Sequence, residues 1–281
     1  MKQATILLVD NGSKRPDATL NLRRLAAALT ARADRGIHPV SLQHADAIPV
    51  DELDGRPAST FASFLREQLD HGQDRFIVLP LFFGPSRALT SFIPDTVSDL
   101  QRQYPAMQLQ LADVLCPLPA GEPRLAEILR DHVAATMQRG QVESARIVLV
   151  DHGSPIAEVT AVRQWLADTL KVLLGDRVAL EQAVMERRSG RQYDFNGRLL
   201  AAVLGELATV NATAPVVLAM LFLSPGRHAG VDGDIAEICQ QAVAENPGLR
   251  ILTTPLVGEH PLLIDILLDR LQASLLQQER S

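Results

Sequence analysis

The chain has 281 residues, of which 47% are hydrophobic and 21% are charged, and it contains 17 Gly, 17 Pro and 2 Cys. This composition is typical of a globular protein and excludes a disordered chain, and two cysteines are too few for a disulfide scaffold. The net charge of -6 provides no general attraction for phosphate backbones or anionic lipids, so we expect neither nucleic-acid nor membrane partners. The length suits either one large domain or two smaller ones.

Three features favour a cytoplasmic protein. The apolar block near the start is interrupted by Asp10 and is too short for the apolar region of a signal peptide. The longest uncharged apolar stretch, residues 212–226, is shorter than the roughly 20 residues that a membrane-spanning helix needs. Cys116 and Cys239 lie far apart in the chain, as is usual for packed thiols in a reducing compartment.

Apolar runs that alternate with helical patterns predict an α/β fold. Four continuous apolar runs are typical of parallel strands buried on both faces: residues 6–9, 76–83, 147–150 and 216–223. Apolar residues at helical spacing predict helices that include residues 20–29, 162–170 and 264–275. Strands that alternate with helices of this length indicate right-handed βαβ units and a parallel sheet in each half of the chain.

The two halves of the chain repeat one another. Residues 6–29 read ILLVDNGSKRPDATLNLRRLAAAL and residues 147–170 read IVLVDHGSPIAEVTAVRQWLADTL, with ten of twenty-four aligned positions identical. Residues 81–88, LFFGPSRA, likewise correspond to residues 221–228, LFLSPGRH. Repeated blocks in the same order indicate duplication of one structural unit.

A third pair of blocks completes the repeat. PLPAGEPRLAEIL, which begins at Pro117, resembles PLVGEHPLLIDIL, which begins at Pro255. We therefore predict two similar domains, an N-terminal one of residues 1–140 and a C-terminal one of residues 141–281. Each is expected to be a parallel sheet flanked by helices.

Two histidines follow predicted strands of the C-terminal half. His152 comes just after the strand at residues 147–150, and His228 follows the strand at residues 216–223. Ligands of parallel sheets bind beyond the carboxyl ends of the strands, so both side chains are expected at the binding edge. Two neighbouring imidazoles can bind ferrous iron, cobalt or nickel and leave positions open for a substrate. A single histidine is more simply explained by a loop hydrogen bond, but the matched pair favours a metal site.

Charged groups are expected at the same edge. Residues 180–188 resemble a strand whose end carries Glu186, a carboxylate able to bind metal or accept a proton. A solvated charge run in a loop is an equally good interpretation. Guanidinium groups bind carboxylates through paired hydrogen bonds, so a polycarboxylate ligand is indicated by the neighbouring arginines: Arg187, Arg188, Arg191 and Arg227.

The N-terminal half lacks the imidazoles at the corresponding positions. Asn11 stands at the place of the first histidine and Ala88 at the place of the second, while Asp46 is expected roughly where the glutamate lies. We therefore predict one active site per chain, in the C-terminal half. Ser13 is retained and is expected to contact an anionic ligand without taking part in the chemistry.

The motifs VDHGSP, AVMERRSGRQYDFNGRLL and LFLSPGRHAGVDGDI, with GEHPLLIDIL near the end, resemble those of the sirohydrochlorin chelatase family, the class II cobalt and iron chelatases in their two-domain form. The resemblance covers both halves. It implies a chelatase-like fold of two similar α/β domains with a cleft between them for the tetrapyrrole. It also implies a lyase of sirohaem, porphyrin or cobalamin biosynthesis with no permanently bound cofactor, for which Fe2+ or Co2+ is a substrate.

The resemblance also implies roles for individual residues. His152 and His228 correspond to the metal-binding and catalytic histidines, and Glu186 to an acid that assists metal binding or deprotonation. The arginines would pair with the carboxylates of sirohydrochlorin, and the backbone at Gly153 and Ser154, at a helix start, would offer a further anion contact. Familiar two-domain bacterial members carry the histidine pair in the N-terminal half instead. An extra residue after the second histidine leaves open which of two nearby aspartates, Asp232 or Asp234, contributes.

We expect insertion of a divalent metal with release of two protons, with ferrous iron ahead of cobalt. The alternatives are a cobaltochelatase of the anaerobic cobalamin pathway, a metal or tetrapyrrole carrier that does not catalyse, and a protoporphyrin ferrochelatase, which a more apolar cleft would favour. A tetrapyrrole methyltransferase that acts upstream is a candidate partner. Both a monomer and a homodimer are compatible with the sequence.

Overall fold

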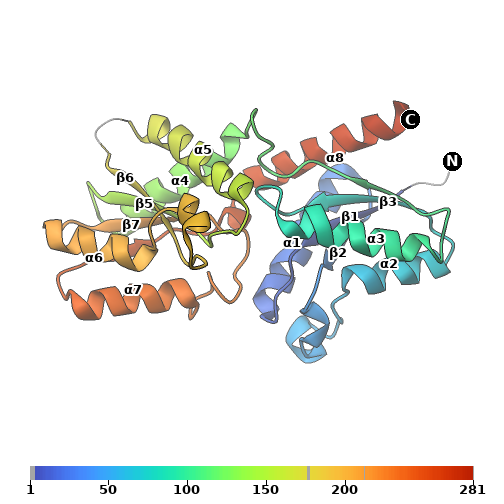
Figure 1. The fold of residues 1–281 in the computed structure, drawn as a ribbon, viewed down its shortest axis with the longest axis horizontal. Coiled ribbons are helices and arrows are strands. Elements are labelled where there is room, and N and C mark those ends of the chain that lie inside the picture. Colours follow the sequence, from blue (N-terminus) through green and yellow to red (C-terminus); the bar gives the residue numbers. More distant parts are fainter. Residues whose placement is uncertain (1–3, 176–177, 212, 281) are drawn as a thin grey trace. The chain divides into compact units, whose positions relative to one another are not determined.

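A computed structural model describes residues 4–175, 178–211 and 213–280 (Figure 1). The chain forms two compact units. Unit 1 comprises Met1–Pro117 and Pro261–Ser281, and unit 2 comprises Leu118–His260. Among the helices of the described residues, none has both the length and the apolar character needed to cross a membrane.

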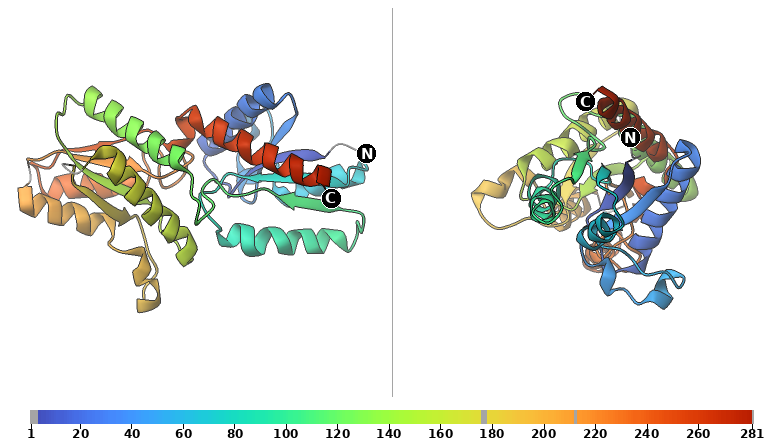
Figure 2. Two further views of the ribbon diagram at one scale, coloured as in Figure 1. Left: turned by 90° about the horizontal axis from the view of Figure 1, so that it is seen from above. Right: turned by 90° about the vertical axis from the view of Figure 1, so that its right-hand side faces the viewer.

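Unit 1 is built on a four-stranded parallel sheet in the order β2-β1-β3-β4. The strands are β1 (Thr5–Asp10), β2 (Ile37–Ser41), β3 (Arg75–Pro80) and β4 (Gln108–Leu111). The α-helices are α1 (Pro16–Ala33), α2 (Phe61–Asp70), α3 (Ile93–Gln101) and α8 (Leu262–Arg280), with short turns η1 (Ala45–Ala47), η2 (Val50–Leu53) and η3 (Ala88–Phe92). Apolar side chains of α2 and α3 pack on one face of the sheet, and α8 packs against α1 and β3 (Figure 2).

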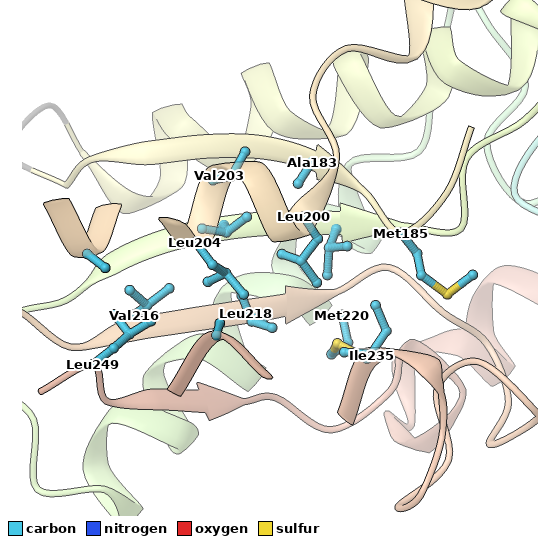
Figure 3. Packing of buried hydrophobic residues seen from close by; sticks show 14 of the residues in the cluster. Ala183, Met185, Leu200, Val203, Leu204, Val216, Leu218, Met220, Ile235 and Leu249 are labelled. Atoms are coloured by element: carbon cyan, nitrogen blue, oxygen red, sulfur yellow. The ribbon is translucent and has the colours of Figure 1, made fainter. Parts of the chain in front are cut away.

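Unit 2 has the same topology, a parallel sheet in the order β6-β5-β7-β8. The strands are β5 (Arg146–Asp151), β6 (Leu180–Val184), β7 (Val216–Met220) and β8 (Ile251–Thr253). The α-helices are α4 (Pro123–Arg139), α5 (Ala157–Leu174), α6 (Leu200–Asn211) and α7 (Asp234–Glu245), with turns η4 (Arg191–Asn196) and η5 (Val257–Glu259). One face of the sheet is covered by α6 and α7: Leu204 and Ile235 pack with strand residues such as Leu218 (Figure 3).

The four predicted strands are the central strands β1, β3, β5 and β7, and the predicted helices lie within α1, α5 and α8. Two of these strands are shorter than the apolar runs suggest, since β3 ends at Pro80 and β7 at Met220. The pairing of β3 with β1 ends at Pro80 and Val9, and that of β7 with β5 ends at Met220 and Val150. The apolar residues that follow belong to loops at the carboxyl edge of each sheet, where the candidate functional residues lie.

The compact units are offset from the sequence repeat by one helix. Helix α4, at the end of the first repeat, packs against α5 and β7 of unit 2. Helix α8, at the end of the second repeat, is held in unit 1, where the amide of Gln110 donates to the carbonyl of Ser274 at 2.9 Å. The ranges 1–140 and 141–281 therefore describe the sequence repeat. The compact units differ from it because α4 buries its apolar face in unit 2 and α8 buries its apolar face in unit 1.

Candidate functional site

The loops after β5 and β6 touch through their backbones at Gly153. This residue has φ of +90°, and a Cβ atom here would overlap the carbonyl oxygen of Glu186. The amide of Glu186 donates to the carbonyl oxygen of His152 at 3.1 Å. Glycine is required because only it combines this backbone conformation with so close an approach. The contact places the carboxylate of Glu186 beside the imidazole of His152.

Three predicted site residues lie together at the carboxyl edge of this sheet. The ring centroids of His152 and His228 are 4.5 Å apart, with an angle of 57° between the ring planes. Nε2 of His152 is 3.2 Å from Oε1 of Glu186. All three side chains are partly exposed, from 34% for His228 to 63% for Glu186. The group is therefore open to a ligand from solvent.

Each imidazole has one nitrogen committed to the protein. Nδ1 of His152 lies 2.9 Å from the carbonyl oxygen of Gly153, and because a carbonyl only accepts hydrogen bonds, Nδ1 carries a proton. Nε2 of the neutral ring then holds a lone pair that faces the carboxylate of Glu186. Two such acceptors repel each other unless a proton or a metal ion lies between them. Either a proton on Nε2 or a metal ion between the two side chains would satisfy both acceptors.

The second histidine is oriented by Asp234, at the first turn of α7. Nδ1 of His228 is 2.5 Å from Oδ2 of Asp234, and Nε of Arg227 is 3.7 Å from the same oxygen. A carboxylate on one imidazole nitrogen fixes the ring and makes the other nitrogen a better metal ligand. Asp232 is exposed. Of the two aspartates, Asp234 is the one that contacts the histidine, because it lies at the start of α7.

No closed metal cage is formed. In the part of the chain that the structure describes, no group of three or more His, Cys, Asp and Glu side chains is arranged to hold a metal ion. Three-ligand binding by His152, His228 and Glu186 is thus not preformed. Burial raises the pKa of the Cys239 thiol to about 11, so this cysteine is a packed thiol rather than a ligand.

The predicted arginines lie on the loops after β6 and β7. Nη1 of Arg187 donates to the carbonyl of Gly197 at 3.0 Å, and the guanidinium of Arg188 lies 5.9 Å from the ring centroid of Tyr193. Arg191, at the start of η4, is exposed, and the side chain of Arg227 is 77% exposed. The four cations therefore belong to the same unit as the histidines, and two of them are anchored by their own loop.

The predicted anion contact at the start of α5 is not available through the backbone amides. The amide of Gly153 donates to Asp151 Oδ1 at 3.1 Å, and that of Ser154 donates to Asn196 Oδ1 at 2.9 Å. The hydroxyl of Ser154 accepts from the amide of Ile156. An anion here would have to displace these internal partners. In unit 1 the hydroxyl of Ser13 forms the equivalent turn with the amide two residues later.

Unit 1 has the same loop geometry without the chemistry. A Cβ atom on Gly12, which has φ of +85°, would overlap the carbonyl oxygen of Gln43. Gln43 therefore occupies the place of Glu186, and the expectation that Asp46 lies there is wrong, because Asp46 is in the turn η1 further along the chain. Asn11 and Ala88 stand at the places of the histidines, as predicted. None of the three side chains in unit 1 is ionisable.

Comparisons with known proteins bear on the family and the fold of the chain. A family model described as CbiX matches residues 5–136 and 146–274, which covers both repeats. A comparison with curated protein sequences finds no match.

Solved structures share the fold over nearly the whole chain. SirB from Bacillus subtilis with Fe3+ has 17% identity and a TM-score of 0.70, with 100% of this chain and 98% of that chain covered. SirB from Bacillus subtilis subspecies spizizenii in complex with cobalt has 17% identity and a TM-score of 0.65, with 97% and 95% covered. CbiX, described as the terminal enzyme for biosynthesis of siroheme in denitrifying bacteria, has 16% identity and a TM-score of 0.56, with 96% and 99% covered. At such identities the likeness shows a shared chelatase-like fold.

Proposed function

The chain belongs to the CbiX family, and on this premise we propose that it is a sirohydrochlorin chelatase, a lyase that inserts a divalent metal ion into the tetrapyrrole ring. The observation that carries the proposal is the open group of two imidazoles and one carboxylate, in which Nε2 of His152 faces Glu186 at 3.2 Å and the ring of His228 lies 4.5 Å from that of His152. The structures of SirB with Fe3+ and in complex with cobalt support a metal ion as the substrate.

The site residues can transfer a metal ion and take up protons. His152 and His228 would bind the incoming ion through Nε2, because each Nδ1 is held by a protein acceptor. As bonds form from the ion to the ring nitrogens, its bonds to the imidazoles break. The two protons that leave the ring go to the carboxylate of Glu186 and to a released imidazole, and from there to solvent. No redox change is needed.

The loops of unit 2 would also bind the ring itself. Sirohydrochlorin carries carboxylates around its edge, and exposed guanidinium groups can pair with them. We assign this role to Arg191 and Arg227, with Arg187 and Arg188 as further contacts from the loop after β6. Ser13 belongs to unit 1, and its contact with an anionic ligand stays a prediction. The anionic substrate thus matches a local set of cations despite the acidic net charge.

Ferrous iron is our first choice of metal and cobalt the second, since imidazole accepts both. The test is to supply the purified protein with sirohydrochlorin and Fe2+, Co2+ or Ni2+ under anaerobic conditions and to follow the absorbance of the ring. We expect faster insertion of iron and cobalt than in the absence of protein, with iron the fastest. If the protein accelerates none of the three, the enzyme proposal is wrong, and metal binding without turnover would identify a carrier.

The position of the metal can be tested separately. Crystals soaked with cobalt should give an anomalous signal between His152 and His228. A signal elsewhere in unit 2, with none at the histidines, would contradict the assignment. We also propose, from composition alone, a cytoplasmic location.

A further inference from the structure

A buried ionic network lies beneath the loop that carries His152. Arg163, on α5, is only 3% exposed. Its Nε forms an ion pair with Oδ1 of Asp151 at 3.2 Å, and its two terminal nitrogens donate to Oε1 of Gln182 at 3.0 Å and to the carbonyl of Asn196 at 2.7 Å. A buried guanidinium is costly unless its charge and its hydrogen bonds are satisfied. Here the charge is paired by Asp151 and the two terminal nitrogens are satisfied by β6 and η4, while Nε is in ion-pair range of Asp151 without a hydrogen bond.

The network ties down the backbone on both sides of His152. The side chain of Asn196 is fully buried: its Oδ1 accepts from the amide of Ser154 at 2.9 Å, and its Nδ2 donates to the carbonyl of Ser154 at 2.8 Å. Before the histidine, Oδ1 of Asp151 accepts from the amide of Gly153 at 3.1 Å. The loop from residue 151 to residue 154 is therefore held by hydrogen bonds to the side chains of Asp151 and Asn196.

Unit 1 lacks this network although it keeps the same strand, loop and helix. In the 141-residue repeat, Leu22 stands at the place of Arg163, and both side chains are buried. Isolated bridges at the ends of β2 and β6 align the following segments and put Pro57 at the place of Asn196. The fold of this region thus does not need the guanidinium or the amide. They occur in the unit that carries the histidines.

We propose that Arg163, Asp151 and Asn196 are positioning residues that hold the backbone of His152, so that Nε2 faces Glu186 and can exchange a metal ion with the ring. The proposal rests on the proposed function, since positioning matters only if this imidazole handles the metal. A loosened loop would misplace the imidazole, and displacements of about 1 Å at reacting groups cost up to about 100-fold in rate.

The cavity beside Arg163 offers a direct test. This cavity has a volume of about 370 Å³ and is lined by Arg163, Gln182, Asn196 and Arg198 among others. In Arg163→Ala, free guanidinium ion can enter and pair with Asp151. We expect kcat for metal insertion to fall about 10- to 100-fold with little change in KM for sirohydrochlorin, and millimolar guanidinium to restore part of kcat.

The matched control is Arg198→Ala. Arg198 lines the same cavity but is partly exposed and pairs with Glu181 and Glu206 on the surface. Its loss should leave kcat within about twofold, and guanidinium should not raise it. Equal concentrations of sodium chloride and urea serve as solvent controls. Rescue specific to Arg163→Ala would support positioning, because a general loss of stability is made worse by guanidinium, not better.

A second variant tests the proposal if Arg163→Ala does not fold. Arg163→Leu combined with Asp151→Asn copies the apolar side chain of unit 1 and leaves no unpaired buried charge. We expect it to fold, as measured by circular dichroism, and to bind Co2+ more weakly with an altered visible spectrum. A folded variant with wild-type kcat and a wild-type cobalt spectrum overturns the positioning role. If the wild-type protein itself inserts no metal, the proposed function fails instead, so the two failures are distinguishable.

Discussion

The carboxyl ends of β1 and β5 are two versions of one structure with different chemistry. Each strand ends in a buried aspartate, and each is followed by a glycine in the left-handed region whose missing side chain lets a second loop approach. Between aspartate and glycine stands Asn11 in unit 1 and His152 in unit 2. The backbone contact thus persists without the imidazole. The comparison shows that the loop geometry belongs to the fold, whereas the histidine and its support belong to the chemistry.

The largest effect is expected when unit 2 receives the residue of unit 1. His152→Asn should lower kcat for metal insertion about 1,000-fold, because asparagine can neither bind the metal as imidazole does nor take up a proton. Anaerobic absorbance assays measure the change. Asn11→Ala in unit 1 is the matched control and should stay within about twofold of wild type. Retention of more than about a tenth of kcat in His152→Asn would remove the imidazole from the chemistry.

Loss of the charge of Asp151 should lower the free energy of unfolding, whereas loss of the charge of Asp10 should raise it. Asp151→Asn leaves the guanidinium of Arg163 buried without its counter-ion, so we expect a loss of about 3 kcal/mol in the free energy of unfolding of unit 2. Urea denaturation at pH 7 measures it. Arg163→Leu in the same chain should restore most of the loss. Full stability in Asp151→Asn alone would show that the ion pair contributes nothing.

Asp234 should matter for activity more than its neighbour. Asp234→Asn removes the charge that holds Nδ1 of His228, and we expect a loss of about 10- to 100-fold in metal affinity or kcat. Cobalt titration and turnover give the two values. Asp232→Asn changes an exposed carboxylate two residues away and is expected to behave as wild type. Equal effects of the two substitutions would point to loop charge in general rather than to the histidine contact.

The smallest effect concerns the pH dependence of unit 1. Burial raises the pKa of Asp10 from 3.8 to about 6. Between these values the folded chain holds a proton that the unfolded chain has released, so this group lowers stability as the pH rises from about 4 to about 6. Asp10→Asn should therefore be neutral near pH 4 and stabilise unit 1 by about 1 kcal/mol at pH 7, after allowance for the altered hydrogen bonds. Urea midpoints at both pH values test this, and a gain at pH 4 alone would contradict it.

The two units also differ in the cavity beside α1 and the corresponding cavity beside α5. Unit 1 has a cavity of about 560 Å³ between α1 and β2, lined by Leu22 and Pro57 among others. The corresponding cavity in unit 2 is smaller, about 370 Å³, and Arg163 and Asn196 line it. In the described residues the Asp10 oxygen Oδ1 has no hydrogen-bond partner, in contrast to the paired carboxylate of Asp151. The larger cavity therefore accompanies the apolar Leu22, and among the described residues each unit keeps a buried polar atom without a hydrogen bond, Asp10 Oδ1 in unit 1 and Arg163 Nε in unit 2.

Much of the fold follows from local patterns. The central strands β1, β3, β5 and β7 are buried on both faces, and a continuous apolar run is a strong signal of such a strand. The edge strands β2, β4 and β8 are short and partly exposed, so they carry no such run and the sequence does not predict them. The sequence reveals the histidines because each lies in the segment that follows a predicted strand. Glu186 could be placed only roughly, since β6 ends two residues before it.

The residues alone determine the duplication, the alternation of strands and helices, and the restriction of the histidine pair to one half, because each is a local pattern that recurs along the chain. Contacts between distant segments decide the rest. Four features depend on such contacts. They are the pairing of His228 with Asp234, the position of Gln43 in unit 1 where unit 2 has Glu186, the burial of Arg163, and the packing of α4 in unit 2 and of α8 in unit 1. The sequence alone does not show these contacts, because they form only when the loops and helices pack together in three dimensions.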